Sequence, residues 1–232
     1  MGEKSQYEKH CRAVRISAVE IDHCWYGVAL APDGVVSTAT GSTEEQARSR
    51  VRHAIPTGAS VEVTGPDAAA ATTDDAERIL AMLAELERGE ESHKHFVISD
   101  TCVGQPLRNV LYAAAGIPIG YVTTYGNIAK AAGSEARAVG RVMATNPLYP
   151  IVPCHRVVGA DFKLVGYGGS QGRNALADKL RRISSEARGY DAERQVEVAG
   201  TWMTVYPAEW VVAAAAVGDE LGDDQSQLSL FE

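Results

Sequence analysis

The sequence lacks long apolar stretches and closely spaced cysteines. An apolar run such as 211–217 is far shorter than the ~20 residues that a membrane-spanning helix needs. Residues 1–5 lack the apolar core of a signal peptide, so we expect a cytoplasmic protein without a membrane anchor. The cysteines form no CxxC pair, which indicates free thiols in a reducing compartment rather than a disulfide framework. They are Cys11, Cys24, Cys102 and Cys154.

The net charge of −8 is unfavourable for binding nucleic acid, but the charge is unevenly distributed. Residues 104–188 hold 11 basic and 4 acidic side chains, a net charge of +7. The flanking segments 1–103 and 189–232 have net charges of −7 and −8. A phosphate-binding module inside an acidic protein would give this distribution, and an ordinary solvated basic face explains it equally well.

The first part of the chain predicts a small domain of strands and helices, residues 1–90. Thr43 caps a helix that runs to about His53, and Thr73 begins a second helix with one apolar face. A polar linker at 89–94 closes this domain. The expected strands are residues 12–21, 25–31, 35–40 and 60–63.

The second part, residues 96–190, predicts a mostly helical domain, so the whole chain is expected to be α+β. Thr124 can cap a helix at 125–132 that Gly133 ends, and Ser134 can cap the next helix, which runs to about residue 145. Two short helices joined through a glycine indicate a helix-turn-helix, although many helical hairpins bind nothing.

Further elements are expected towards the C-terminus. They are helices at 107–115 and about 175–186, a hairpin at 194–205 that turns at Ala199-Gly200, a C-terminal extension at 191–217 and a flexible acidic tail at 218–232.

Three prolines precede a single cysteine, Cys154, in the segment 146–158. Proline restricts the backbone, so this segment predicts a rigid approach to a defined thiol position. A thiol attacks as its thiolate, which needs a cation, a base or a helix dipole nearby. His155 and Arg156 follow directly, yet on these residues alone a buried structural cysteine is the commoner explanation.

The run Pro153-Cys154-His155-Arg156-Val157 resembles the active-site motif of the O6-alkylguanine-DNA alkyltransferases, or methylated-DNA–protein-cysteine methyltransferases. The similarity covers about residues 96–190 and favours a reactive cysteine over a structural one. Residues 1–90 fit the family's N-terminal domain only in length and in strand–helix order. Further similar segments, in the family's order, are 104–107, 117–120, 124–129, 136–140, 146–147 and 166–169.

The resemblance implies direct-reversal DNA repair by a single-turnover DNA-protein-cysteine S-methyltransferase. The alkyl group would pass irreversibly from O6-alkylguanine in double-stranded DNA to Cys154, after the base has left the duplex. Arg137 would fill the space that the base vacates, while small Ala136 and Gly140 let the helix lie close to DNA. Arg156 is also expected to bind DNA.

The resemblance further implies that His155 acts as the base through a water molecule and that a carboxylate orients it. Glu186 is the candidate carboxylate, and Asp178, two turns earlier, is the rival. The product is a thioether without a good leaving group, so the protein would act once. Such a displacement needs no redox or metal cofactor, so none is expected.

Three more residues receive roles from the resemblance. Asn146 would hold the turn that presents the cysteine loop. Tyr125 would donate its hydroxyl to the leaving guanine or contact the adjacent phosphate, and Tyr167 would donate to the O6 side. Without the motif, both tyrosines would be ordinary core residues with satisfied hydroxyls.

Some members of the family carry zinc in the N-terminal domain, but we expect no metal here. The spacing of the available side chains matches no metal motif. The residues considered are Cys11, His23, Cys24, His93 and His95.

Two other functions compete with alkyl transfer. One is a non-catalytic protein that binds alkylated bases and recruits other repair, and the presence of Cys154 argues against it. The other is a cysteine hydrolase or acyltransferase, and only Cys154 and His155 support it.

The segment 225–232 resembles the peptide by which many replication and repair proteins bind the ring-shaped sliding clamp. Gln225, Leu228 and Phe231 have the matching spacing, and a short turn would place Leu228 and Phe231 on one face. Glu232 stands where a second aromatic residue is usual, so a modest affinity is expected. The protein is otherwise expected to be a monomer associated with the nucleoid.

Overall fold

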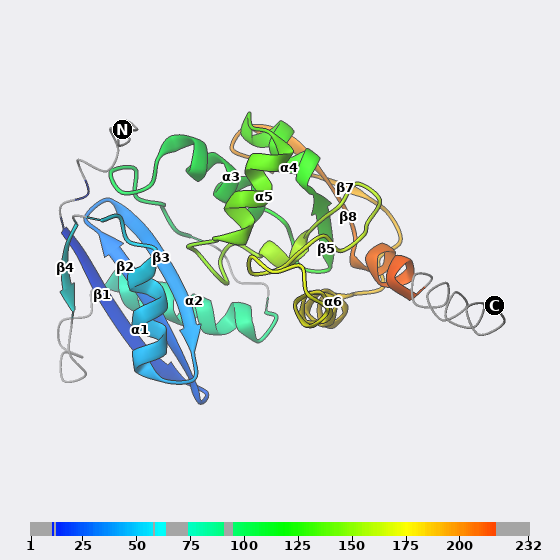
Figure 1. Ribbon diagram of the computed structural model, residues 1–232. Coiled ribbons are helices and arrows are strands. Elements are labelled where there is room, and N and C mark those ends of the chain that lie inside the picture. The colour runs from blue at the N-terminus through cyan, green and yellow to red at the C-terminus, as the bar shows by residue number, and fades with distance from the viewer. Residues whose placement is uncertain (1–10, 12, 58, 64–73, 91–94, 217–232) are drawn as a thin grey trace, which may run out of the picture. The chain divides into compact units, whose positions relative to one another are not determined.

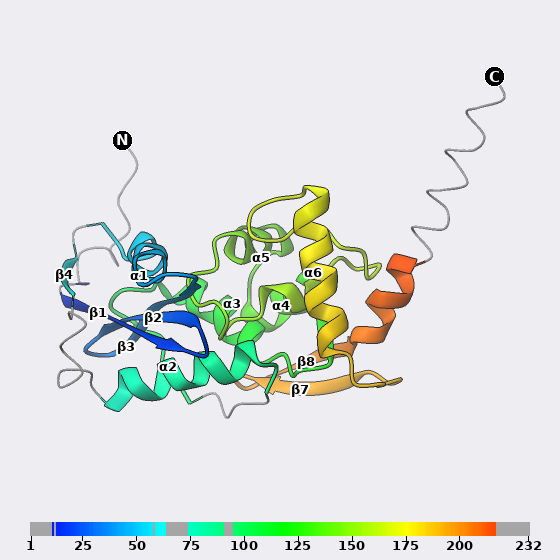
Figure 2. The same ribbon diagram turned by 90° about the horizontal axis from the view of Figure 1, so that it is seen from below.

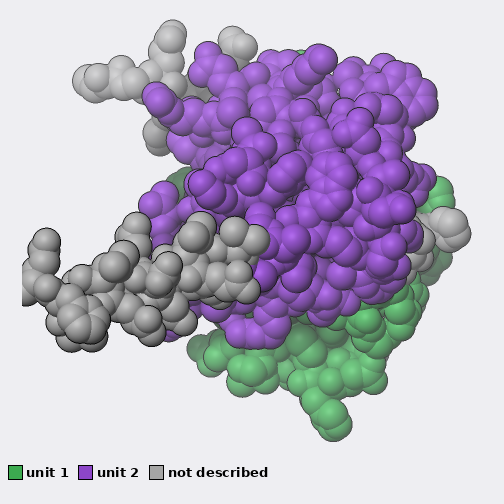
Figure 3. Space-filling view, turned by 90° about the vertical axis from the view of Figure 1, so that its right-hand side faces the viewer, with its two compact units in different colours: residues 1–115, 146–152 green, residues 116–145, 153–232 purple. Residues whose placement is uncertain are grey.

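The computed structural model describes residues 11, 13–57, 59–63, 74–90 and 95–216. The chain forms two compact units, which Figure 3 colours separately. Unit 1 comprises Met1–Ala115 and Asn146–Val152, and unit 2 comprises Gly116–Thr145 and Pro153–Glu232. Strands and helices occur in both units, so the predicted α+β class is confirmed.

A four-stranded sheet in the order β3-β2-β1-β4 forms the centre of unit 1. β1 pairs antiparallel with β2 and parallel with β4. Figures 1 and 2 show helices α1 and α2 on opposite faces of this sheet, which buries the middle of β2 from both sides. The elements are β1 (Ala13–Ile21), β2 (Cys24–Ala31), β3 (Gly34–Gly41), α1 (Glu44–His53), β4 (Ser60–Val63) and α2 (Asp74–Glu87).

The local signals in unit 1 work as predicted. Thr43 is the N-cap of α1, and its hydroxyl oxygen accepts a hydrogen bond from the backbone N–H of Gln46 at 3.2 Å. The four predicted strands occur within two residues of their expected ends.

The segment 146–152 belongs to unit 1 although it follows the helix-turn-helix in the chain. The backbone N–H of Thr38 donates to the carbonyl of Pro147 at 2.8 Å, and the Thr38 hydroxyl donates to the carbonyl of Tyr149 at 2.8 Å. Helix α3 (Gln105–Ala115) is also counted with unit 1. The two compact units therefore do not coincide with the domains predicted from the sequence, 1–90 and 96–190. The domain boundary expected at 90–96 stays a prediction.

A disulfide joins Cys11 to Cys102, so the expectation that these two cysteines are free thiols is wrong. Residues 97–99 lie beside β3, where the Val35 N–H donates to the Val97 carbonyl at 2.7 Å. This pairing brings Cys102 within a Cα–Cα distance of 4.6 Å of Cys11 across 91 residues of sequence. A contact between such distant residues leaves no local spacing pattern in the sequence.

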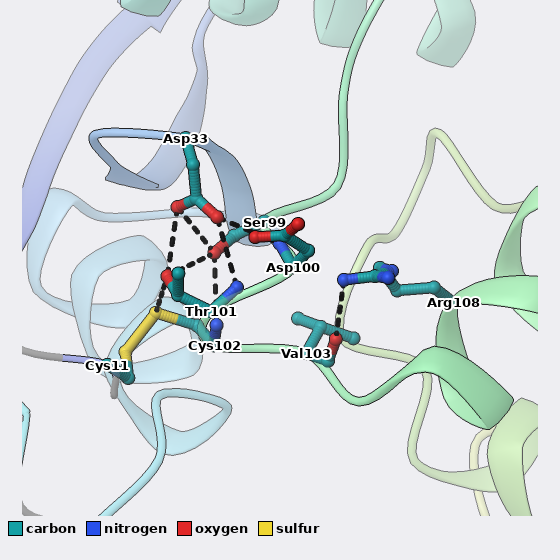
Figure 4. The surroundings of a disulfide bond; sticks show 8 residues. All are labelled: Cys11, Asp33, Ser99, Asp100, Thr101, Cys102, Val103 and Arg108. Carbon is teal, nitrogen blue, oxygen red and sulfur yellow. Dashed lines mark hydrogen bonds between the residues drawn. A yellow bond between two sulfur atoms is a disulfide. The ribbon is translucent and has the colours of Figure 1, made fainter. Parts of the chain in front are cut away.

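The carboxylate of Asp33 anchors the loop that carries Cys102 (Figure 4). It accepts hydrogen bonds from the Ser99 hydroxyl at 2.8 Å, from the backbone N–H groups of Asp100 and Thr101 at 2.9 and 3.0 Å, and from the Thr101 hydroxyl at 3.0 Å. Burial raises the pKa of Asp33, but these hydrogen bonds outweigh it and hold the pKa below its usual range. The Asp33 side chain thus fixes the loop independently of the disulfide.

Unit 2 surrounds a second sheet, in the order β6-β5-β8-β7. Its core contains Val122, Val158, Ile183, Ala208 and Val211. Residues 208–216 form a helix after β8. The other elements are β5 (Tyr121–Thr124), α4 (Tyr125–Ala132), α5 (Ala136–Ala144), the 3-10 helix η3 (Cys154–Arg156), β6 (Val157–Val158), α6 (Arg173–Glu186), β7 (Arg194–Val198) and β8 (Thr201–Pro207).

The helix pair α4–α5 is built largely as predicted. The Thr124 hydroxyl oxygen accepts from the Asn127 N–H at 3.1 Å, and Gly133 ends α4 in the left-handed conformation at φ 62°. The prediction that Ser134 caps α5 is wrong, because Glu135 is the N-cap residue. The Ser134 N–H donates to the carbonyl of Ala129 at 2.8 Å, so Ser134 completes the end of α4 instead.

The hairpin β7–β8 confirms the predicted turn at Ala199-Gly200, and β8 extends the sheet through its pairing with β5. Among the residues that the structure describes, no helix is long and apolar enough to cross a membrane. The acidic tail 218–232, with the proposed clamp-binding residues, lies outside the described residues, as does His93.

Candidate active site

Cys154 lies at the start of η3, directly before strand β6. β6 pairs in parallel with β5, with Val157 opposite Thr123, which fixes the cysteine relative to the strand that leads into α4. In unit 1, the Asn146 side chain donates to the carbonyl of Val152 at 2.7 Å and accepts from the Leu148 N–H at 3.0 Å. These two bonds close the turn that precedes Pro153 and Cys154.

His155 contacts Glu186, the last residue of α6. The distance from Nε2 of His155 to Oε1 of Glu186 is 2.9 Å, and both side chains are buried. Asp178, the rival carboxylate, instead pairs with Arg181 at 2.7 Å, and both side chains are largely exposed. The structure therefore brings Glu186, and not Asp178, to the histidine.

The charge states of this pair follow from their surroundings. Burial is the largest effect on His155 and lowers its pKa, so the ring is neutral at neutral pH. Burial raises the pKa of Glu186, but hydrogen bonds from His155 and Arg156 outweigh it and lower the pKa to about 2. A carboxylate can only accept, so the ring hydrogen lies on Nε2. Nδ1 is then the basic nitrogen, and it has no hydrogen-bond partner among the described residues.

Arg156 is buried, so the expectation that it binds DNA is wrong. Its Nε donates to Oε2 of Glu186 at 2.6 Å, and its Nη2 donates to Oε1 at 2.8 Å. Its Nη1 donates to the carbonyl of Ile117 at 2.8 Å. The guanidinium thus clamps Glu186 through two parallel bonds, the geometry that arginine offers a carboxylate.

A cavity of about 480 Å³ opens beside Cys154. Helix α4 contributes Tyr125, and helix α5 contributes the predicted DNA-binding residues Ala136, Arg137 and Gly140. Burial is the largest effect on Tyr125 and raises its pKa, and the charge of Cys154 raises it further. Tyr125 therefore keeps its hydroxyl proton near neutral pH and can donate it in a hydrogen bond.

A tight hairpin forms the other side of this cavity. Tyr167 and Ser170 exchange backbone hydrogen bonds at 2.9 and 3.0 Å, around Gly168 and Gly169. Both glycines have positive φ, 56° and 77°, as the type I′ form of a two-residue hairpin turn requires, and other residues rarely adopt such values. The loop that carries Tyr167 therefore has a defined shape.

Sequence reasoning gave no role to Lys179, which is fully buried beside the cysteine. Its Nζ donates to the carbonyls of Val157 at 2.5 Å and Gly166 at 2.9 Å, and it lies 5.8 Å from the centre of the Tyr125 ring. Burial lowers its pKa to about 8, while the charge of Cys154 raises it. Its spacing of seven residues from Glu186 puts both on one face of α6, a signal that the sequence contained.

No group of three or more potential metal ligands lies together among the residues that the structure describes. Cys11, one of the residues considered for zinc, is bonded to Cys102 instead.

The fold and the site define an α+β protein in which a helix-turn-helix lines a pocket containing a buried cysteine, next to a buried His–Glu pair. Residues 106–188 match the family model described as "6-O-methylguanine DNA methyltransferase, DNA binding domain". The matched segment holds the helix-turn-helix and the cysteine pocket.

The chain is also similar to curated proteins named methylated-DNA--protein-cysteine methyltransferase. One from Pyrobaculum aerophilum is 59% identical over 54 residues, which cover 23% of this chain and 36% of the relative. One from Mycobacterium leprae is 45% identical over 85 residues, covering 36% and 52%. The inducible protein of Bacillus subtilis is 36% identical over 101 residues, covering 42% and 56%. The chain thus spans between about a third and just over half of the length of these relatives.

Among solved structures, Mycobacterium tuberculosis OGT in complex with DNA is 24% identical, with a TM-score of 0.48. The match covers 76% of this chain and 96% of that one.

Proposed function

We propose that this protein repairs alkylated double-stranded DNA by moving the alkyl group from O6 of guanine onto the sulfur of Cys154, once per molecule. The observation that carries the proposal is the buried His155–Glu186 pair, which leaves the basic Nδ1 of the residue next to Cys154 available. The family of residues 106–188 and the names of the relatives support the same activity.

The proposed reaction begins with removal of the thiol proton. His155 accepts this proton on Nδ1 through one water molecule, while Glu186 stabilises the positive ring through Nε2. The thiolate attacks the alkyl carbon, a carbon–sulfur bond forms and the carbon–O6 bond breaks, with its electron pair left on the guanine. The guanine then takes up a proton, so that overall the thiol proton ends on the base.

The other pocket residues assist this displacement. Tyr125 donates a hydrogen bond to the departing guanine, and Tyr167 donates to the O6 side. Arg156 keeps Glu186 ionised and directed at His155 through its two hydrogen bonds. The thioether product has no leaving group that water could replace, so Cys154 is not regenerated.

In the proposed complex the target guanine is turned out of the duplex, because its O6 substituent is out of reach inside the base stack. Arg137 is exposed on α5 and lines the cavity, which supports a role in filling the gap left in the duplex. Gly140 has open space where a Cβ would stand, and Ala136 is small, so the duplex can approach the helix closely.

The mass of the intact protein after incubation with a duplex containing O6-methylguanine tests the activity. We expect one methyl group per molecule on a peptide that contains Cys154, and no gain with Cys154→Ser, because a hydroxyl is far harder to ionise. A non-catalytic binding protein would bind the duplex without any gain in mass. Methyl groups on Cys24, or turnover beyond one equivalent, would contradict the mechanism.

Free O6-benzylguanine can donate its alkyl group without leaving a duplex, so comparing its transfer rate with that of duplex DNA separates base flipping from alkyl transfer. Arg137→Ala is expected to slow transfer from duplex DNA much more than transfer from the free base. Equal losses on both substrates would assign Arg137 to folding or to the pocket.

We also propose, from the sequence of residues 225–232 alone, that the C-terminal segment binds the sliding clamp through Gln225, Leu228 and Phe231. Calorimetry of a peptide of residues 218–232 against the clamp should give modest binding that Phe231→Ala abolishes. Binding that is indifferent to Phe231 would refute this proposal.

We further propose a monomer in the cytoplasm, associated with the nucleoid, because its substrate would be genomic DNA. Fluorescence microscopy of a tagged chain should show it over the nucleoid, and light scattering should give the mass of one chain. Thiol labelling of protein taken directly from cells would report whether the Cys11–Cys102 bond forms there, since disulfides are uncommon in a reducing cytosol.

A further inference from the structure

Two arginines of α5, not one, lie on the rim of the cavity. Arg137 and Arg141 both line it, four residues apart, and both are exposed, whereas Cys154 in the same lining is buried. Residues four apart lie on the same side of a helix, about 6 Å apart along its axis at 1.5 Å per residue. The cavity therefore has a buried nucleophile and a rim with two positive charges.

Neither arginine of this rim is paired with a carboxylate within the described part of the protein. Helix α5 contains no acidic residue, and neither guanidinium has a hydrogen bond or ion pair with a described residue, its N-cap residue Glu135 included. Several other arginines in the structure do have a carboxylate partner. Examples are Arg48 with Glu44, Arg78 with Asp75, Arg156 with Glu186 and Arg181 with Asp178.

Helix stability does not account for this arrangement. Like charges four residues apart repel each other, and Arg137 in the first turn also opposes the helix dipole. Gly140, beside Arg141, lowers the stability of a helix interior, and a Cβ there would meet nothing within 4 Å. Only Arg141, in the last turn, is favoured by the dipole, so a test must separate that structural effect from binding.

From this geometry we propose that Arg141 binds a phosphate of the nucleotide whose base enters the cavity, while Arg137 occupies the gap in the duplex. The inference rests on the proposed function and adds a residue to it. A guanine whose O6 substituent reaches the buried Cys154 lies inside the cavity, and its sugar and phosphate then extend towards the exposed rim. The guanidinium of Arg137 cannot fill the gap in the duplex and bind the DNA backbone at the same time. The guanidinium of Arg141, one helical turn away, offers the planar set of N–H donors that binds a phosphate.

The test compares Arg141→Gln with Arg52→Gln, a matched charge change on the exposed side of α1 in unit 1. Binding is measured with Cys154→Ser protein on a duplex containing O6-methylguanine, at several salt concentrations. Loss of one phosphate contact should weaken binding about 10-fold and reduce the slope of log K against log salt by about 0.9. Arg52→Gln should change neither quantity.

The phosphate itself can be located chemically. Each phosphate near the lesion is replaced in turn by an uncharged methylphosphonate. In the Cys154→Ser protein one replacement should weaken binding, and the same replacement should have no further effect once Arg141→Gln is also present. With Cys154 intact, Arg141→Gln should slow transfer from free O6-benzylguanine, which has no phosphate, much less than transfer from the duplex.

An unchanged salt slope, additive effects at every phosphate, or an equal loss on free O6-benzylguanine would overturn the proposal. The last result would place Arg141 in the pocket or in the folding of α5. The binding measurements need no chemistry, so they decide the role of Arg141 even if no alkyl group is transferred.

Discussion

Reduction of the Cys11–Cys102 bond is expected to destabilise unit 1 by several kcal/mol without changing its folded structure. The bond closes a loop across 91 residues, and the loss of its restraint on the unfolded chain corresponds to about 4.6 kcal/mol at 25 °C. This figure is an upper limit, because residual structure in the unfolded chain reduces it. The folded loop should persist after reduction, since Asp33 holds it through hydrogen bonds from Ser99, Asp100 and Thr101.

Urea unfolding with and without a reductant measures this effect. Trp25 on β2 reports on unit 1, and Trp202 and Trp210 report on unit 2, so single-tryptophan variants can follow each unit separately. We expect reduction to lower the unfolding midpoint at Trp25 by more than ~1 M urea. Cys102→Ala should unfold like the reduced protein under both conditions, and Cys24→Ser should respond to the reductant as the original chain does. Identical midpoints for the oxidised and reduced chain would refute the reasoning.

The other predictions concern the site. Glu186→Gln leaves Arg156 without its buried carboxylate partner, so it should lower the free energy of unfolding by about 3–5 kcal/mol and slow alkylation of Cys154. Denaturant titration and transfer rates measure these two effects. The control Asp178→Asn should cause neither. The folded pKa of Glu186 is about 2 against an ordinary 4.5, so the unfolded chain binds the proton more tightly. This carboxylate then contributes about 3 kcal/mol to the free energy of unfolding above pH 4.5, and this contribution is lost as the pH falls from 4.5 to 2. The free energy of unfolding should therefore fall more steeply in this window for the original chain than for Glu186→Gln. The same pH dependence in both proteins would contradict this prediction. Gly140→Ala should stabilise α5 by about 0.5–1 kcal/mol, and it should slow transfer from duplex DNA but not from free O6-benzylguanine. Faster transfer from the duplex would contradict the proposed close approach of DNA to Gly140.

The sequence by itself determined the local structure. Thr43 and Thr124 cap their helices, Gly133 ends α4, and Ala199-Gly200 turns the hairpin β7–β8, because each of these signals acts through hydrogen bonds or φ values a few residues away. The motif around Cys154 also pointed to the pocket, since the residues that line it come in a recognisable order along the chain.

Only the tertiary structure decided which distant side chains meet. The choice of Glu186 over Asp178 depends on how α6 packs against η3, and the burial of Arg156 depends on the same packing. The sequence indicates that Lys179 shares a face of α6 with Glu186, but only the packing of that face puts Lys179 beside Cys154. Cys11 and Cys102 meet because residues 97–99 pair along β3. Each of these contacts joins residues at least 22 positions apart, and no local spacing rule reaches that far.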